Sequence, residues 1–207
     1  MVWLANKCLP GRPLAWPTEP TRPSKAATHF WRSGIPTGLG IPGISKMRAL
    51  QSIPSNEVAR VRAGLDEALR GAGPALIVFD PSAATRTPVP SEVADHIALV
   101  VETSGSSGAP KRVALSAEAL LASARASHGR LGGPGQWLLA LPTNYIAGLQ
   151  VLTRSIDSGI PCGELPGGPF TPEAFCRGVA AMDHSRTYSS VVPYQLARLC
   201  EFAESSE

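Results

Sequence analysis

The chain of 207 residues is long enough for one domain, or for one and a half at most. Its hydrophobic fraction of 43% is too high for a fully disordered protein. No run of about 18 apolar residues occurs, so we expect no membrane-spanning helix and no membrane partner. The formal net charge of +3 suggests nucleic-acid binding, which the distribution of charge along the chain tests.

Residues 1–46 differ in composition from the rest. They hold seven of the prolines and three of the four tryptophans, without a helical or strand period. Six basic residues and one acidic residue give them a net charge of +5, which leaves −2 for the remainder. A basic, aromatic segment can bind nucleic acid by phosphate pairing and base stacking. The spaced prolines and unclustered charges favour a disordered Pro/Trp/basic extension instead, so we expect no nucleic-acid partner.

Helical and strand patterns alternate from Met47 onward. Short apolar runs predict strands at 75–79, 97–101, 112–115, 137–141 and 188–192. Helical spacing predicts helices over Ile146–Ser158, from Pro193, and after three N-cap residues, Asn56, Ser116 and Thr171. Gly71 and Gly159 stand past two of the helix ends. The strands are continuously apolar rather than alternating. This pattern predicts an α/β fold with a mostly parallel sheet and helices on both faces.

The four cysteines, Cys8, Cys162, Cys176 and Cys200, form no C-x-x-C pair, and the four histidines are scattered singly. Zinc sites need such residues in clusters, so we expect no metal site within the chain. Free or buried thiols of a reducing compartment explain the cysteines. The N-terminus lacks the uninterrupted apolar stretch of a secretory signal, and we expect a cytoplasmic location.

The most informative segment lies at 103–111, directly after the strand at 97–101. It reads T-S-G-S-S-G-A-P-K, with four hydroxyl side chains, two glycines and one lysine. Such residues suit a polyphosphate, because glycines admit backbone N–H groups close to an anion while hydroxyls and a lysine add donors and charge. A flexible Ser/Gly surface loop is the alternative. A Walker loop, G-x-x-x-x-G-K-(S/T), is excluded, because Lys111 stands three residues past Gly108 and a strand follows.

This segment resembles the phosphate-binding signature of the adenylate-forming ligases, which include the acyl-CoA synthetases and amino-acid adenylation domains. Their pattern, (S/T)-S-G-(S/T)-(S/T)-G-x-P-K-G-V, is matched throughout 103–111 and again at Val113, while Arg112 replaces the usual glycine. The flanking stretches 131–142, 146–155, 170–175 and 190–198 look like o-succinylbenzoate–CoA ligases of menaquinone biosynthesis, especially the compact actinobacterial type. The resemblance identifies 47–207 as a partial AMP-binding domain, the first part of the large domain of such a ligase.

The resemblance implies a reaction and a set of site residues. A carboxylate, here o-succinylbenzoate, reacts with ATP to an acyl-adenylate, and coenzyme A then displaces AMP to form a thioester. The residues expected to hold the phosphates of ATP are Thr103, Ser104, Gly105, Ser106, Ser107, Gly108 and Lys111. Those expected at the substrate pocket are Tyr145, Gly148, Pro193 and Gln195. Tyr145 stands where many relatives carry histidine, and the alternative role for it is a core aromatic at a helix start. For Pro193 and Gln195 the alternative role is simply to begin a helix.

The family's other functional segments find no match in this sequence. Relatives bind Mg2+ through a glutamate and drive adenylation with a lysine from a small C-terminal domain, and Lys111 is the one lysine after Lys46 here. We therefore assign no catalytic residue, since the expected lysine would lie beyond the chain end. A truncated, non-catalytic fragment that keeps only the phosphate-binding loop is the alternative function.

Overall fold

The structure is a computed structural model that describes residues 2–4, 46–83, 88–103, 111–165 and 170–205. Residues 1–8 and 46–207 form one compact unit. The second unit, 9–45, lies outside the described residues, and with it most of the segment for which we expect a disordered extension. Within that segment the structure describes the strand β1 (Val2–Leu4) and Lys46.

The larger sheet has the strand order β4-β2-β3-β5-β6. Its members are β2 (Met47–Pro54), β3 (Ala75–Phe79), β4 (Glu92–Ala94), β5 (Ile97–Thr103) and β6 (Lys111–Ser116). The three inner strands run parallel, and both edge strands pair antiparallel with their neighbours. The smaller sheet has the order β1-β9-β7-β8, with β7 (Gln136–Leu139), β8 (Gly163–Glu164) and β9 (Thr187–Ser190) parallel and β1 antiparallel.

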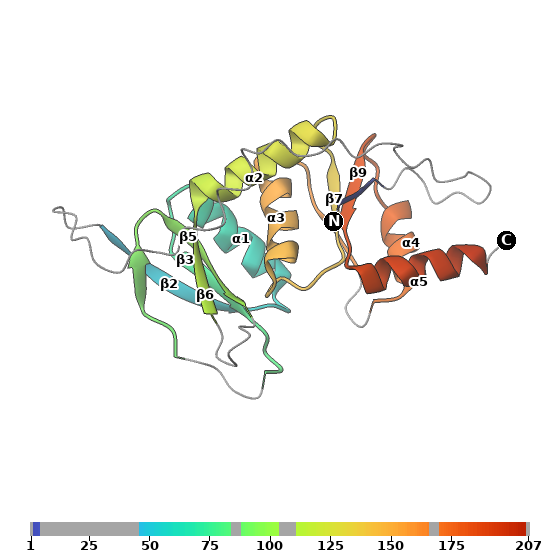
Figure 1. The fold of residues 1–207 in the computed structure, drawn as a ribbon. Coiled ribbons are helices and arrows are strands. Elements are labelled where there is room, and N and C mark those ends of the chain that lie inside the picture. Colours follow the sequence, from blue (N-terminus) through green and yellow to red (C-terminus); the bar gives the residue numbers. More distant parts are fainter. Residues whose placement is uncertain (1, 5–45, 84–87, 104–110, 166–169, 206–207) are drawn as a thin grey trace, which may run out of the picture. The chain divides into compact units, whose positions relative to one another are not determined.

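Helices α1 (Val58–Leu69) and α3 (Ile146–Ser158) lie between the two sheets, and α2 (Ala117–Arg130) runs along the top of the view from the larger sheet toward the smaller (Figure 1). Their apolar faces share one core with both sheets, for instance through Leu65, Leu99 and Trp137. Helices α4 (Pro172–Ala180) and α5 (Pro193–Glu204) pack on the opposite face of the smaller sheet, in a second core around Leu138 and Phe175.

The predicted α/β fold is confirmed, and the structure refines it in two respects. The parallel strands divide into two sheets instead of one. Among the described residues, helices cover both faces of the smaller sheet but one face of the larger, whose other face holds a small core around Ile77, Ile97 and Val100. The split arises because α2, which follows β6, leads the chain away to the second sheet.

Most predicted helix ends are confirmed. Ser116 Oγ accepts a hydrogen bond from Ala119 N at 3.1 Å, and Thr171 Oγ1 accepts one from Ala174 N at 3.2 Å. Gly71 and Gly159 both have positive φ. The predicted cap at Asn56 is wrong, because α1 begins one residue later.

The residue before α1 is Glu57, which makes no side-chain capping bond. Its backbone N–H donates to Pro54 O at 3.1 Å, so a turn occupies the residues between β2 and the helix. Cys162 and Cys200 form no disulfide among the described residues, and Cys8 lies outside them. No helix in the described ranges is long and apolar enough to cross a membrane.

Candidate ligand-binding site

The predicted phosphate-binding segment joins two antiparallel strands. Thr103 is the last residue of β5 and pairs with Lys111, the first residue of β6. The Thr103 hydroxyl donates to Lys111 O at 3.2 Å and so links the two ends of the loop. The Lys111 side chain is exposed. Ser104, Gly105, Ser106, Ser107 and Gly108 lie outside the described residues, so the structure bears on the ends of this loop only.

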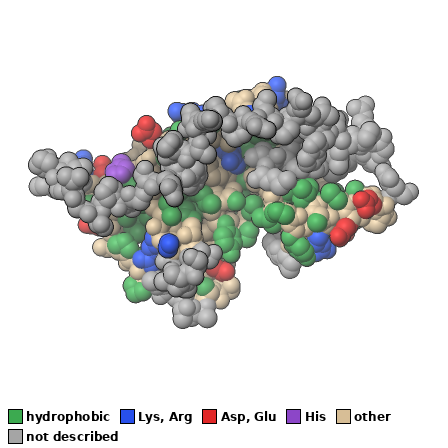
Figure 2. Space-filling model, in the orientation of Figure 1, with side chains coloured by type: hydrophobic (Ala, Val, Ile, Leu, Met, Phe, Trp, Pro, Cys, Tyr) green, Lys and Arg blue, Asp and Glu red, His purple; other side chains and the backbone are tan. Residues whose placement is uncertain are grey.

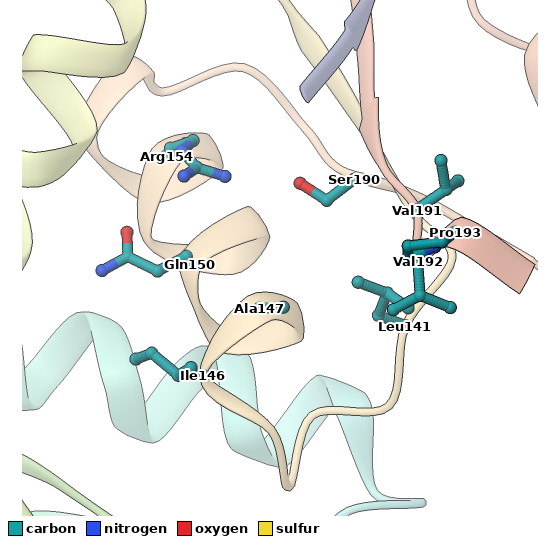
Figure 3. A pocket seen from close by; sticks show the side chains of 9 residues that line it. All are labelled: Leu141, Ile146, Ala147, Gln150, Arg154, Ser190, Val191, Val192 and Pro193. Carbon is teal, nitrogen blue, oxygen red and sulfur yellow. The ribbon is translucent and has the colours of Figure 1, made fainter. Parts of the chain in front are cut away.

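A pocket of about 280 Å³ lies between α3 and the turn from β9 into α5 (Figure 3). One wall comes from α3 and the other from the ends of β7 and β9. Its lining residues are Leu141, Ile146, Ala147, Gln150, Arg154, Ser190, Val191, Val192 and Pro193. Ligands of α/β proteins commonly bind outside the carboxyl ends of parallel strands, which is where this pocket lies.

The mouth of the pocket is apolar. Ile146 and Val192 line the pocket and are exposed large hydrophobic residues. Tyr145 and Tyr194, which adjoin the lining residues in the chain, are exposed as well. Figure 2 shows one face of the molecule, on which hydrophobic side chains gather between scattered charged ones. An apolar rim around a few polar groups is typical of small-molecule sites.

Arg154 is the charged residue of the pocket. It is 9% exposed, and its guanidinium lies 4.6 Å from the centroid of the Trp137 ring. Figure 3 shows the Arg154 side chain and the Ser190 hydroxyl pointing toward each other across one end of the pocket. Arg154 Nε has no hydrogen-bond partner among the described residues, and no described carboxylate forms an ion pair with this side chain.

Such an environment favours an anionic ligand. Burial lowers the pKa of the Arg154 guanidinium, which nevertheless stays a cation at neutral pH. A buried charge without a counterion is costly, and the interaction with the Trp137 ring offsets only part of that cost. A carboxylate in the pocket would provide the missing partner.

The four predicted pocket residues take different places. Pro193 lines the pocket at the first turn of α5. Gln195 is buried and does not line it. The Gln195 side chain donates to Ala140 O at 3.0 Å and accepts from Val192 N at 3.1 Å, so it joins the end of β7 to the start of α5. It therefore fixes the position of the α5 start relative to the end of β7, and with it two walls of the pocket.

Tyr145 and Gly148 flank the pocket from the start of α3. Tyr145 precedes the helix and is 58% exposed. Gly148 is buried against the backbone of the preceding loop, where an added Cβ would lie 2.3 Å from Pro142 O. Glycine at this position lets α3 approach the end of β7.

The sequence analysis missed Arg154, Gln150 and Ser190. Arg154 did carry a signal: in the predicted helix Ile146–Ser158 it is one of two charged residues, among apolar neighbours that are buried. An isolated arginine on the buried face of a helix needs a partner or a function. Ser190 carried none, because only the arrangement of β9 beside α3 brings it to the pocket.

The comparisons with known proteins agree with the resemblance found in the sequence. The profile of the family described as AMP-binding enzyme matches residues 43–207. A probable 2-succinylbenzoate–CoA ligase from Mycobacterium tuberculosis is 40% identical over 156 residues, which are 73% of this chain and 41% of that protein. The chain thus spans about two fifths of the length of this curated relative.

Among solved structures, the chain is similar to o-succinylbenzoate coenzyme A synthetase from Bacillus subtilis. The complex with AMP has a TM-score of 0.45 and 26% identity, over 60% of this chain and 34% of that one. The complex with the acyl-adenylate intermediate has a TM-score of 0.49 and 20% identity, and the match covers 73% of this chain and 51% of that one.

Proposed function

Since the chain belongs to the family of AMP-binding enzymes, we propose that it acts in an ATP-dependent acid–CoA ligase. The acid is o-succinylbenzoate, which is activated to an acyl-adenylate and passed to coenzyme A in menaquinone biosynthesis. This choice of acid is supported by the relative of 40% identity, a probable 2-succinylbenzoate–CoA ligase. The proposal keeps the cytoplasmic location expected from the sequence.

The observation that carries the proposal is the buried, unpaired Arg154 in the pocket. A carboxylate of the acid would lie against the guanidinium, with Ser190 at the same end of the pocket. The apolar residues Leu141 and Val191 would pack against the hydrocarbon part of the acid. Because Arg154 is 9% exposed, water has little access to its guanidinium, so a charge-assisted bond to it would be strong and directional.

The residues at the ends of the Gly-rich loop fit a polyphosphate. Lys111 presents an exposed ammonium group at the first position of β6, while the Thr103 hydroxyl closes the hairpin. We assign phosphate binding to Lys111 together with Ser104, Gly105, Ser106, Ser107 and Gly108, and a supporting role in this loop to Thr103. When bound, ATP supplies the activation of the carboxylate; the chain's task is to orient the acid and to pair the phosphate charge. For Mg2+, no cluster of three or more acidic, His or Cys side chains exists among the described residues.

Binding of o-succinylbenzoate to the full chain, measured by isothermal titration calorimetry, tests the carboxylate assignment. Arg154→Met should weaken binding by about tenfold or more, because a buried charge pair is lost. Arg125→Met is the matched control: its Nε bonds Asp157 Oδ1 at 3.1 Å on the surface, and this variant should bind like the wild type. Circular dichroism verifies the fold of both. Equal binding by Arg154→Met, or no binding by the wild type, would contradict the assignment.

The non-catalytic fragment remains the second candidate function, favoured by the 41% coverage of the curated relative. ATP–pyrophosphate exchange in the presence of o-succinylbenzoate and Mg2+ separates the two. We expect acid binding without exchange from this chain alone, because no residue was assigned to the lysine's role. Measurable exchange would reject the fragment and support an independent ligase.

A further inference from the structure

Strand β1 occupies one edge of the smaller sheet. It pairs antiparallel with β9, with Val2 opposite Ser190, Trp3 opposite Ser189 and Leu4 opposite Tyr188. All other pairings of this sheet are parallel. Residues 1–8 belong to the same compact unit as 46–207. The edge of β9 is therefore covered by a segment from the far end of the chain, in the direction opposite to its neighbours.

The handedness of the sheet indicates which strand this edge would otherwise accept. From β7 to β8 the chain crosses by α3, on the side of the shared core. From β8 to β9 it crosses in the opposite direction by α4, on the opposite face. Both connections have the same hand, as parallel β-α-β units require.

Helix α5 packs on the same face as α4, through Leu196 and Leu199. A right-handed connection through α5 must therefore continue in the direction of the α4 crossover. The next parallel strand would lie directly beyond β9. That position is the one that β1 holds.

We propose that Val2–Leu4 forms a removable cap on the β9 edge, which competes for this edge with a further parallel strand connected through α5. Uncovered edges expose unpaired N–H and C=O groups and invite association, so a short cap has a protective role. The matched residues make up 41% of the curated relative, so the remainder of that protein is the part in which we look for such a strand.

The cap also bears on the pocket. Val2 pairs with Ser190, which lines the pocket. A parallel strand at this edge would bring its carboxyl end, and the loop after it, to the pocket beside Ser190. The antiparallel β1 brings its amino end there instead. The pocket can therefore have either β1 or a further parallel strand beside Ser190, but not both at once.

Amide hydrogen exchange of the full chain tests the cap. In the double variant V2P/W3P, prolines replace two successive residues of β1, so whichever of the two N–H groups points toward β9 is removed. The exchange of those amides in 187–190 that face β1 should then be about tenfold faster. The amides of 187–190 that bond to β7 and those of β3 serve as internal controls for the fold. The variant V2T/W3T keeps strand propensity and should exchange like the wild type. Unchanged exchange in V2P/W3P would overturn the cap.

A measurement on the unmodified chain applies even where the proline variant fails to fold. Cross-strand nuclear Overhauser contacts between the backbones of Trp3 and Ser189 are expected, and their absence overturns the cap. Competition is tested with the part of the Mycobacterium tuberculosis relative outside the matched region, added as a separate polypeptide. It should bind V2P/W3P about tenfold more tightly than V2T/W3T; equal binding, or no binding to either, overturns the competition. Neither experiment requires acid, ATP or coenzyme A, so their failure is distinct from failure of the proposed function.

Discussion

Gly148 shows how a single residue sets the distance between a helix and the strand end beside the pocket. A Cβ at this position would lie 2.3 Å from Pro142 O, 2.8 Å from Pro142 C and 2.9 Å from Leu141 O. All three atoms belong to the backbone, so no side-chain rotation relieves the overlap. The first turn of α3 must move away from the loop if the glycine is replaced.

We predict that Gly148→Ala lowers the free energy of unfolding by roughly 1–3 kcal/mol, the usual cost of overpacking. Urea denaturation measures this change. Gly129→Ala is the matched control, since an added Cβ on this residue of α2 meets nothing within 4 Å. Alanine is the better helix former, so the control should be neutral or slightly stabilising. Equal stability of the two variants would contradict the close approach of backbone at Gly148.

At the scale of elements, α2 and α3 are joined by a polar cluster around one buried histidine. His128 is 6% exposed, and its Nδ1 lies 3.5 Å from Asp157 Oδ2. The other carboxylate oxygen of Asp157 accepts from Arg125 Nε at 3.1 Å. Burial lowers the pKa of His128 most strongly; Arg154 acts in the same direction and Asp157 opposes it. His128 Nε2 has no partner among the described residues.

These contacts predict an acid-dependent loss of stability. The pKa of His128 is lower in the folded chain than the usual unfolded value of about 6.5, so the unfolded state binds more protons as the pH falls. The contribution of neutral His128 to the free energy of unfolding is therefore present above the unfolded pKa and is lost as the pH falls below it. His128→Gln should make the free energy of unfolding less dependent on pH between about 7 and 5. Denaturation at several pH values measures it, with the exposed His96→Gln as control. A variant as pH-dependent as the wild type would argue against the assignment.

For the whole molecule, the shared core makes the two sheets depend on each other. Buried residues of β3, β5, β7 and β9 belong to one cluster with α1, α2 and α3. A buried hydrogen bond adds to it: Thr143 Oγ1, after β7, donates to Ser55 O, after β2, at 2.9 Å. Since Thr143 is 1% exposed, water has little access to its hydroxyl group. We expect both sheets to unfold in one cooperative transition.

Thr143→Val removes this bond while keeping the shape of the side chain. It should lower the free energy of unfolding by about 1–2 kcal/mol, because a carbonyl loses its buried donor. Thr153→Val is the control: its hydroxyl donates at 2.9 Å to Leu149 O, a carbonyl within the same helix, so its loss should cost less than about 0.5 kcal/mol. Thermal unfolding followed by circular dichroism compares the two. Two separate transitions would contradict the shared core.

Local signals sufficed for many elements. The bounds of α3, the caps at Ser116 and Thr171 and the two strands that flank the Gly-rich loop were all predicted from residues a few positions apart. The family could also be predicted from local sequence, since its signature is one continuous segment. Strands β4 and β8 escaped prediction because three and two residues carry too little pattern. β2 was missed because its residues alternate between exposed and half-buried and do not form an apolar run.

By itself, the sequence determined the family, the α/β class and most helix ends, because caps, turns and helical spacing act over a few residues. Only the tertiary structure decided the division into two sheets, the link from Gln195 to Ala140 and the pocket that joins Arg154 to Ser190. It also decided that Val2–Leu4 covers the edge of β9. These contacts join residues far apart in the chain. Their partners are chosen by packing and by the handedness of crossovers, which no local pattern records.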